Sequence, residues 1–181
     1  MGIETEVKIK ISNPEDFCRN LQRCDFRILA DRHFEDNYLL DFLDGRLHAG
    51  QCMVRIREAN SQAFLTYKGA SRPEGIFKVR EELETGLENS ETALHILERL
   101  GMIVWFRYQK YRREFEMDEV VVAVDETPIG NYAEFEGSEP SILALTGKMG
   151  IDPSQFLRAS YYSLYLEYCE GRGERPSFML F

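Results

Sequence analysis

Hydrophobic and polar residues alternate with a period of two along most of the chain, in short runs separated by turn residues. Successive side chains of a β-strand point to opposite faces, so this pattern predicts strands with one apolar and one polar face. Other segments, between the runs, have the longer period of a helix. The predicted strands are Ile3–Ile11, His33–Asp41, Met53–Glu58, Ala63–Lys68, Phe77–Glu84, Trp105–Glu116, Val120–Glu126 and Tyr132–Gly137.

Start and stop signals predict four helices between and after these strands. Ser12 and Pro14 open the first helix, and Ser90 is the expected N-cap of the second. The four predicted ranges are Pro14–Cys24, Glu91–Leu100, Glu139–Met149 and a last helix from Ser160 to the residue before Gly171. Residues 44–51 and 69–75 are polar and contain glycine, so they are expected to be loops. We expect a single domain, residues 1–170, followed by a tail, residues 171–181.

Charged residues gather on one face of each predicted strand. On the first strand Glu4, Glu6 and Lys8 share a face opposite Val7 and Ile9. A face turned to solvent is the simpler explanation of one such strand. Here, however, the charges are grouped by sign, and the helices need the apolar faces to pack against. We therefore predict an α+β fold, an eight-stranded antiparallel closed β-barrel or tunnel with helices packed outside and the charged faces inside.

A barrel of this kind would place basic and acidic side chains around one interior space. A concentration of arginine and lysine needs an anion, and the guanidinium fork matches a chain of phosphates. The basic residues expected there are Lys8, Arg55, Arg57, Lys68, Arg80, Lys110 and Arg112. Carboxylates in the same space favour Mg²⁺ or Mn²⁺, and they are Glu4, Glu6, Glu82, Glu134 and Glu136. Together they predict metal-assisted phosphoryl transfer, which needs no separate nucleophile motif.

Composition restricts the partners of such a protein. The 181 residues include 22 Lys and Arg against 31 Asp and Glu, a formal net charge of −9. This balance argues against binding to nucleic acid or to an anionic membrane. No apolar run approaches the roughly 18 residues of a membrane span, and the N-terminal residues lack the apolar core of a signal peptide. We therefore expect a soluble, cytoplasmic protein with reduced cysteines and neither zinc nor disulfide.

The charged residues also form an ordered set of short motifs. In chain order the set is Glu4-Thr5-Glu6-Val7-Lys8, Asp36-Asn37-Tyr38, Arg55-Ile56-Arg57, Leu65-Thr66-Tyr67-Lys68-Gly69, Arg80-Glu81-Glu82, Lys110-Tyr111-Arg112, Asp125, Glu134-Phe135-Glu136 and Ser160-Tyr161. These resemble the ExExK, DxYF, RxR, LTxKG, RxE, KxR, aspartate, ExE and SY motifs of the CYTH, or triphosphate tunnel metalloenzyme, superfamily. That superfamily includes class IV adenylyl cyclases, thiamine triphosphatases and inorganic tripolyphosphatases. The resemblance covers about residues 3–165, with Ile129-Gly130 in place of the usual LG turn.

The resemblance implies a role for each matching position. Lys8, Arg55, Arg57, Lys68, Arg80, Lys110 and Arg112 resemble the ligands of a triphosphate. Glu4, Glu6, Asp125, Glu134 and Glu136 resemble groups that hold one or two divalent metals, Mg²⁺ or Mn²⁺. Glu4, Glu6, Lys8 and Glu82 are the residues expected to take part in catalysis. Arg112 and Arg113 compete for one inward position, and the alternation favours Arg112. Because some members of the superfamily pair, a homodimer is left open.

Three functions remain open at this point. The first is metal-dependent hydrolysis of a triphosphate such as tripolyphosphate, thiamine triphosphate or a nucleoside triphosphate. The second is a class IV adenylyl cyclase, which makes cyclic AMP from ATP, and the third is a noncatalytic polyphosphate- or nucleotide-binding module. Buried carboxylates argue against the third, because they would repel the anion.

Two further expectations concern individual side chains. Like charges should repel in an empty tunnel, so replacing Arg57 or Lys68 with alanine is expected to weaken substrate binding without loss of stability. His48 is expected in a solvated loop, and the tyrosines are expected to pack in the core.

Overall fold

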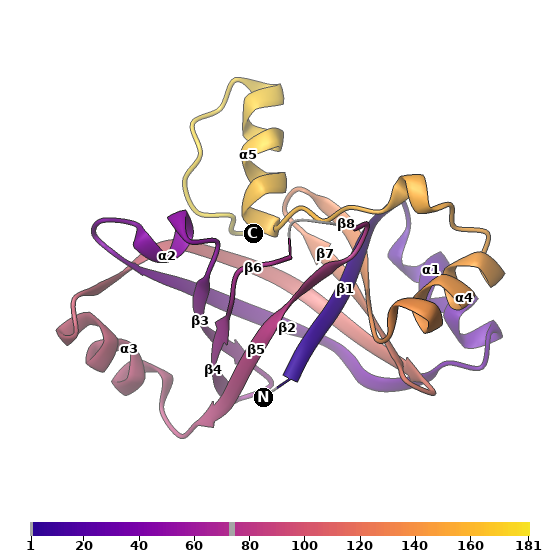
Figure 1. Ribbon diagram of the computed structural model, residues 1–181, viewed down its shortest axis with the longest axis horizontal. Helices are drawn as coiled ribbons and strands as arrows, with labels where there is room; N and C mark the ends of the chain where they lie inside the picture. Colours follow the sequence, from indigo (N-terminus) through magenta and orange to yellow (C-terminus); the bar gives the residue numbers. More distant parts are fainter. Residues whose placement is uncertain (1, 73–74) are drawn as a thin grey trace.

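The protein is described by a computed structural model that covers residues 2–72 and 75–181. Its centre is a barrel of antiparallel strands with helices around it (Figure 1). The strands are β1 (Gly2–Ile11), β2 (Arg27–Phe42), β3 (Met53–Ala59), β4 (Gln62–Lys68), β5 (Lys78–Leu87), β6 (Met102–Met117), β7 (Val120–Thr127) and β8 (Gly130–Glu136). The helices are α1 (Pro14–Arg23), α2 (Arg46–Ala49), α3 (Ser90–Arg99), α4 (Glu139–Lys148) and α5 (Tyr161–Arg172), with a 3₁₀ turn at Pro153–Gln155.

The barrel closes through β1, which pairs on one side with β5 and on the other with β8. The strand order is β1-β5-β4-β3-β2-β6-β7-β8, and every neighbouring pair is antiparallel. In the part of the chain that the structure describes, closure gives every strand a neighbour on both sides, which limits pairing with other chains. The predicted α+β fold with a closed eight-stranded antiparallel barrel is confirmed.

β2 is longer than the alternation predicts, because it begins at Arg27 and not at His33. Its pairing with β6 shifts register between Ile28 and Ala30 and again between Ala30 and His33. A bulge puts one extra residue into a strand and so interrupts the two-residue alternation. The first part of β2 therefore does not have the pattern from which the strand was predicted.

The N-caps of the first two long helices lie one residue from their expected places. Asn13, not Ser12, caps α1, and its Oδ1 accepts hydrogen bonds from the backbone N–H of Glu15 and Asp16. Asn89, not Ser90, caps α3. Asparagine and serine are nearly equal as caps, so two adjacent candidates cannot be ranked from propensity alone.

A short helix, α2, occupies the predicted loop at 44–51. Its backbone is fixed by the buried carboxylate of Asp41, which accepts hydrogen bonds from the N–H groups of Phe42, Leu47 and His48 at 2.7–3.0 Å. These bonds hold the pKa of Asp41 below its ordinary value against the opposing effect of burial. The other predicted loop, 69–75, includes positions 73–74, which lie outside the described residues.

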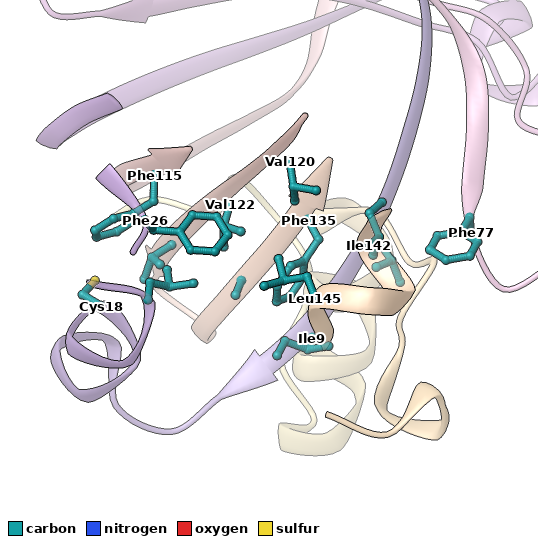
Figure 2. Packing of buried hydrophobic residues seen from close by; sticks show 14 of the residues in the cluster. Ile9, Cys18, Phe26, Phe77, Phe115, Val120, Val122, Phe135, Ile142 and Leu145 are labelled. Carbon is teal, nitrogen blue, oxygen red and sulfur yellow. The ribbon is translucent and has the colours of Figure 1, made fainter. Parts of the chain in front are cut away.

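The largest apolar cluster lies outside the barrel, where α1 and α4 cover β1, β7 and β8 (Figure 2). Cys18 and Leu21 come from α1, and Ile142 and Leu145 come from α4. They pack on the apolar strand residues, among them Phe135, which has no exposed surface. Because the helices take the apolar faces, the charged faces are left to line the interior.

α5 stands at one end of the barrel, and the chain returns from it to β6 (Figure 1). The helix ends at Arg172, two residues later than predicted, with Gly173 in the left-handed conformation (φ 68°). The predicted tail is anchored to the barrel: Met179 is buried and exchanges backbone hydrogen bonds with Arg107 and Gln109. The boundary between domain and tail at residue 170 stays a prediction. None of the described helices has the length and apolar character that crossing a membrane requires.

Candidate functional site

The inward faces of the strands surround a cavity of about 660 Å³, called the tunnel below. With one exception, Asp125, all the predicted site residues line it. They are Glu4, Glu6, Lys8, Arg55, Arg57, Lys68, Arg80, Glu82, Lys110, Arg112, Glu134 and Glu136. Arg112 faces inward as the alternation favours, whereas Arg113 pairs with Glu15 of α1 at 3.4 Å. Two-residue alternation therefore separated the inner from the outer face correctly.

Strand register places opposite charges side by side on the tunnel wall. Glu4 is the cross-strand partner of Arg80, and Lys8 is the partner of Glu134. The same holds for Glu6 and Lys78, for Lys68 and Glu82, for Glu35 and Lys110, and for Arg112 and Asp125. Directly opposed residues of an antiparallel pair lie on the same face, about 5 Å apart, so each pair can form an ion pair.

One group of ion pairs joins β1 to β4 and β5. Lys68 Nζ lies 2.6 Å from Glu4 Oε1 and 3.2 Å from Glu82 Oε2, and Arg80 Nε lies 3.0 Å from Glu4 Oε2. Lys78 Nζ lies 3.0 Å from Glu6 Oε1. Burial alone would raise the pKa of Glu6, but the positive charges of Lys78, Lys8 and Lys68 together more than offset it and hold that pKa far below its ordinary value. Glu6 is therefore ionised.

A second group joins β1, β6, β7 and β8. Lys8 Nζ lies 2.7 Å from Glu134 Oε1, and Arg112 contacts Glu134 as well. Asp125 has no exposed surface and lies behind the wall, where it accepts hydrogen bonds from Lys110 (2.9 Å), Arg112 (2.7 Å) and the hydroxyl of Tyr161 (2.5 Å). Both oxygens of Asp125 are thus occupied by protein donors, and its role as a metal ligand stays a prediction.

Further charged residues at the tunnel were not assigned to the site from the sequence, among them Glu84 and Lys78, which line the cavity, and Glu35, which lies behind its wall. Glu84 lies 3.1 Å from Arg57 Nη2 and 3.7 Å from Arg55 Nη2. Glu35 is almost fully buried and approaches Arg57 at 3.6 Å and Lys110 at 3.4 Å. The sequence could have identified them, because each lies at an even number of positions from the inward-facing residues of its own strand and therefore points to the same face.

The expectation that the basic residues of the empty tunnel repel one another without compensation is wrong. Among the described residues, nine basic and seven acidic side chains line the cavity. Each of the seven predicted phosphate ligands already has a carboxylate within 4 Å. Removing one partner of a buried pair leaves the other charge uncompensated, which destabilises a protein. Loss of Lys68 or Arg57 should therefore cost stability.

The carboxylates supply the kind of donor that Mg²⁺ or Mn²⁺ prefers. Glu136 carries the clearest sign of crowded negative charge, because burial and the nearby Glu4, Glu82 and Glu6 raise its pKa to about 7. A divalent cation would relieve that repulsion, so the donor set fits a metal. Within the described ranges no three such side chains converge as a finished metal site. They contact lysine and arginine instead.

Glu35 also links the tunnel to His33, whose protonation should affect stability. His33 Nδ1 donates to the backbone oxygen of Asp31 (2.8 Å), and Nε2 lies 3.5 Å from Glu35 Oε1. The hydrogen bond with Glu35 raises the pKa of His33 above its ordinary 6.5. This stabilisation is complete below pH 6.5 and is lost as the pH rises through the raised value.

We therefore expect the free energy of unfolding to fall as the pH rises from 6.5 through the raised pKa of His33, and His33→Gln to lessen that fall. Urea unfolding at several pH values measures it. Glu136 also lowers the free energy of unfolding as the pH rises towards 7, because its pKa is raised to about 7 in the folded protein. The difference between wild type and His33→Gln isolates the histidine. Parallel stability curves for the two proteins would contradict the assignment.

The end of the tunnel near α5 is lined by aromatic rings. His48, Trp105 and Tyr162 all border the cavity, as do the neighbouring Cys52 and Met53. His48 is exposed, as expected, but it lies on the short helix α2 and not in a loop. Tyr162 packs against the core cluster around Phe106, as expected, but it also borders the cavity. The short helix α2 brings His48 to the tunnel, and the first turn of α5 brings Tyr162. Neither placement can be read from local alternation.

The chain thus forms a closed antiparallel barrel whose interior carries paired cations and carboxylates. The CYTH domain model matches residues 2–145. The chain belongs to the CYTH family.

Proteins of similar sequence and structure agree with this assignment. The "Putative adenylate cyclase MJ0240" of Methanocaldococcus jannaschii is 25% identical over 173 residues, which are 90% of this chain and 98% of that protein. An X-ray structure named a putative adenylate cyclase, from Vibrio parahaemolyticus, is 19% identical with a TM-score of 0.77, covering 90% of this chain and 97% of the other. HpAC1 from Hippeastrum, described as a putative adenylyl cyclase with a dominant triphosphatase activity, is 17% identical with a TM-score of 0.66, covering 97% and 98%. The two structures share the fold of this chain.

Proposed function

We propose that the protein hydrolyses a triphosphate with the help of Mg²⁺ or Mn²⁺. One observation carries the proposal: seven lysines and arginines suited to phosphate and a set of carboxylates suited to a divalent ion line the same enclosed cavity. Lys8, Arg55, Arg57, Lys68, Arg80, Lys110 and Arg112 would bind the phosphate chain. Glu4, Glu6, Asp125, Glu134 and Glu136 would hold the metal.

Binding would proceed as an exchange of partners. Phosphate oxygens would replace carboxylates as the acceptors of the arginine and lysine hydrogen bonds, since both are anionic oxygen acceptors. The displaced carboxylates, Glu4 and Glu134 among them, would then be uncompensated in a buried site. A divalent ion, when bound, neutralises charge on phosphate oxygens and acidifies a bound water. The metal should therefore bind more tightly to the protein that already holds triphosphate than to the free protein, and triphosphate should bind more tightly to the protein that already holds the metal.

The chain's own groups have distinct roles in the proposed reaction. The basic residues would neutralise the negative charge that shifts to the leaving phosphate oxygen as the P–O bond breaks. Lys8, buried on the tunnel wall, is one of them. Glu82 lies on the wall beside Lys68 and would orient the attacking water. Enclosure by the barrel limits the competing hydrogen bonds of bulk water.

Cyclisation of ATP to cyclic AMP is the second candidate. The name of the Methanocaldococcus jannaschii relative supports it. The Hippeastrum protein, whose description gives both activities and names the triphosphatase as dominant, supports the order in which we place the two. A cyclase would use the same phosphate ligands but would also have to activate the ribose 3′-hydroxyl.

A product assay separates these functions. We expect tripolyphosphate or ATP to release inorganic phosphate in Mg²⁺ or Mn²⁺, and EDTA to abolish the release, because the freed carboxylates need a cation. Incubation with tripolyphosphate, thiamine triphosphate and ATP, followed by separation of the products, measures the outcome. Cyclic AMP as the main product would reverse the ranking. Binding without any turnover of the three compounds would favour a noncatalytic module.

A further inference from the structure

Buried polar atoms that lack a hydrogen-bond partner within the protein gather between β2 and β3. In the described part of the chain they include both polar atoms of the Asn37 side chain, Nε of Arg57 and Nε of Arg55. Asn37 has no exposed surface. An unpaired polar group in a protein interior costs stability, and such groups are rare in folded proteins. The side chain of Asn37 therefore needs an explanation that the fold alone does not supply.

Asn37 lies on the inward face of β2, directly beside a proposed phosphate ligand. It is the cross-strand partner of Arg57 on β3 and of Tyr108 on β6, and both of these residues line the tunnel. Leu39, two residues further along the same face of β2, lines the tunnel as well. Directly opposed residues of an antiparallel pair have their Cα atoms about 5 Å apart. The amide of Asn37 is thus a close neighbour of the Arg57 side chain.

In the free protein, carboxylates on two strands hold the guanidinium group of Arg57. Its Nη2 donates to both carboxylate oxygens of Glu84, at 3.1 and 3.2 Å, and its Nη1 lies 3.6 Å from Glu35 Oε1. Its Nε has no hydrogen-bond partner in the protein. A guanidinium group carries five N–H donors in one plane, and an asparagine side chain carries an acceptor oxygen. Arg57 therefore has an unused donor close to the unused acceptor of Asn37.

We propose that Asn37 is a positioning residue that accepts the Nε–H of Arg57 when a phosphate chain occupies the tunnel. This inference rests on the proposed function, in which phosphate oxygens replace carboxylates such as Glu84 as the partners of the arginines. Once released from Glu84, the guanidinium group turns its Nε–H to Asn37 Oδ1. Both Nη groups then face the phosphate as a fork, the geometry that makes arginine a strong phosphate ligand. Asn37 acts on the arginine and does not touch the substrate.

Replacing Asn37 should have opposite effects on stability and on binding. Asn37→Leu keeps the branch at Cγ and removes both polar atoms, so the free protein no longer buries an unpaired amide. We expect its melting temperature in EDTA to rise by at least about 2 °C. Without the acceptor Arg57 is held less firmly, and calorimetry in EDTA should show tripolyphosphate binding about tenfold more weakly. Asn37→Val, which is smaller and favours strands, should show the same loss of binding if leucine does not fit.

A double-mutant cycle tests whether Asn37 acts through Arg57. Arg57→Lys keeps the positive charge but has no Nε–H to donate to Asn37. In that background Asn37→Leu should change the affinity for tripolyphosphate by less than about twofold, because the hydrogen bond is already absent. Asn131→Leu is the matched control, since Asn131 also lies on a strand, β8, but outside the residues that line the tunnel. It should leave tripolyphosphate binding unchanged.

The outcomes separate this inference from the function on which it rests. If wild type and both Asn37 variants bind tripolyphosphate equally well, the positioning role is overturned while the triphosphate site stands. An equal loss of affinity in the Arg57→Lys background would also overturn it, because Asn37 would then act on another group. Lower melting temperatures of both Asn37 variants would show that Asn37 serves the fold, which again overturns the proposal.

If wild type does not bind tripolyphosphate, the proposed function fails and this inference fails with it. Weaker binding that depends on Arg57, in a protein that melts at a higher temperature, would support the positioning role of Asn37.

Discussion

Glu134→Gln is expected to lower turnover of a triphosphate at least about a hundredfold while tripolyphosphate still binds. Glu134 is proposed to hold the metal, and its amide replacement is a much weaker ligand for a hard divalent ion. In the free protein Glu134 also competes with substrate for Lys8 and Arg112. Removing that competitor should leave metal-free binding of tripolyphosphate unchanged or make it tighter. Phosphate release and calorimetry in EDTA measure the two effects separately.

Calorimetry with Mg²⁺ completes this test. In wild type, Mg²⁺ should bind weakly alone and tightly with tripolyphosphate, because the anion releases carboxylates from their lysine and arginine partners. Glu126→Gln is a suitable control, since Glu126 is also ion-paired, with Arg32 at 2.7 Å, but lies outside the residues that line the tunnel. Normal turnover by Glu134→Gln, or no coupling between Mg²⁺ and tripolyphosphate in wild type, would refute the proposed metal site.

Much of the barrel could be predicted because alternation is a local property. Glu4, Glu6 and Lys8 lie on the tunnel wall, and Val7 and Ile9 lie in the outer core, as their parity indicates. The prediction failed where a bulge interrupts the parity, as in the first part of β2. It also failed where a distant side chain supports the backbone, as Asp41 does for α2.

The pairing of charges could not be predicted, because it depends on which strands are neighbours. Glu4 meets Arg80 only because β1 pairs with β5, and Lys8 meets Glu134 only because β1 also pairs with β8. Residues about seventy or more positions apart in the chain become partners through barrel closure. Without knowledge of the strand neighbours, the basic residues were expected to repel one another, whereas the strand register places a carboxylate beside each of them.

This pairing changes what each substitution is expected to do. A basic residue that only bound substrate could be removed without loss of stability. In this tunnel the same basic residue also neutralises a buried carboxylate until a phosphate group replaces that carboxylate as its partner. Substrate affinity and stability of the free protein are therefore properties of the same contacts, and a variant should lose both.

Lys68→Ala is expected to destabilise the free protein by about 3 kcal/mol and also to weaken tripolyphosphate binding. Lys68 and Glu4 side chains are 8% and 5% exposed, and their charged atoms lie 2.6 Å apart. Without the ammonium group, Glu4 keeps its ion pair with Arg80 but loses the one with Lys68, and Glu82 loses its ion pair with Lys68 as well. For a chain of this size the loss corresponds to a melting temperature lower by roughly 6–12 °C. Thermal unfolding in EDTA measures it.

A double variant shows whether the lost ion pair is the cause. Lys68→Met with Glu4→Gln removes both charges and keeps the side-chain volumes, so it should recover most of the stability but not the binding of tripolyphosphate. Lys10→Ala, an exposed lysine on the same strand as Glu4, should change stability by less than about 0.5 kcal/mol. If Lys68→Ala melts at the wild-type temperature, the ion pair contributes nothing to stability. Lys68 would then be held in the tunnel for its substrate alone, as the sequence first suggested.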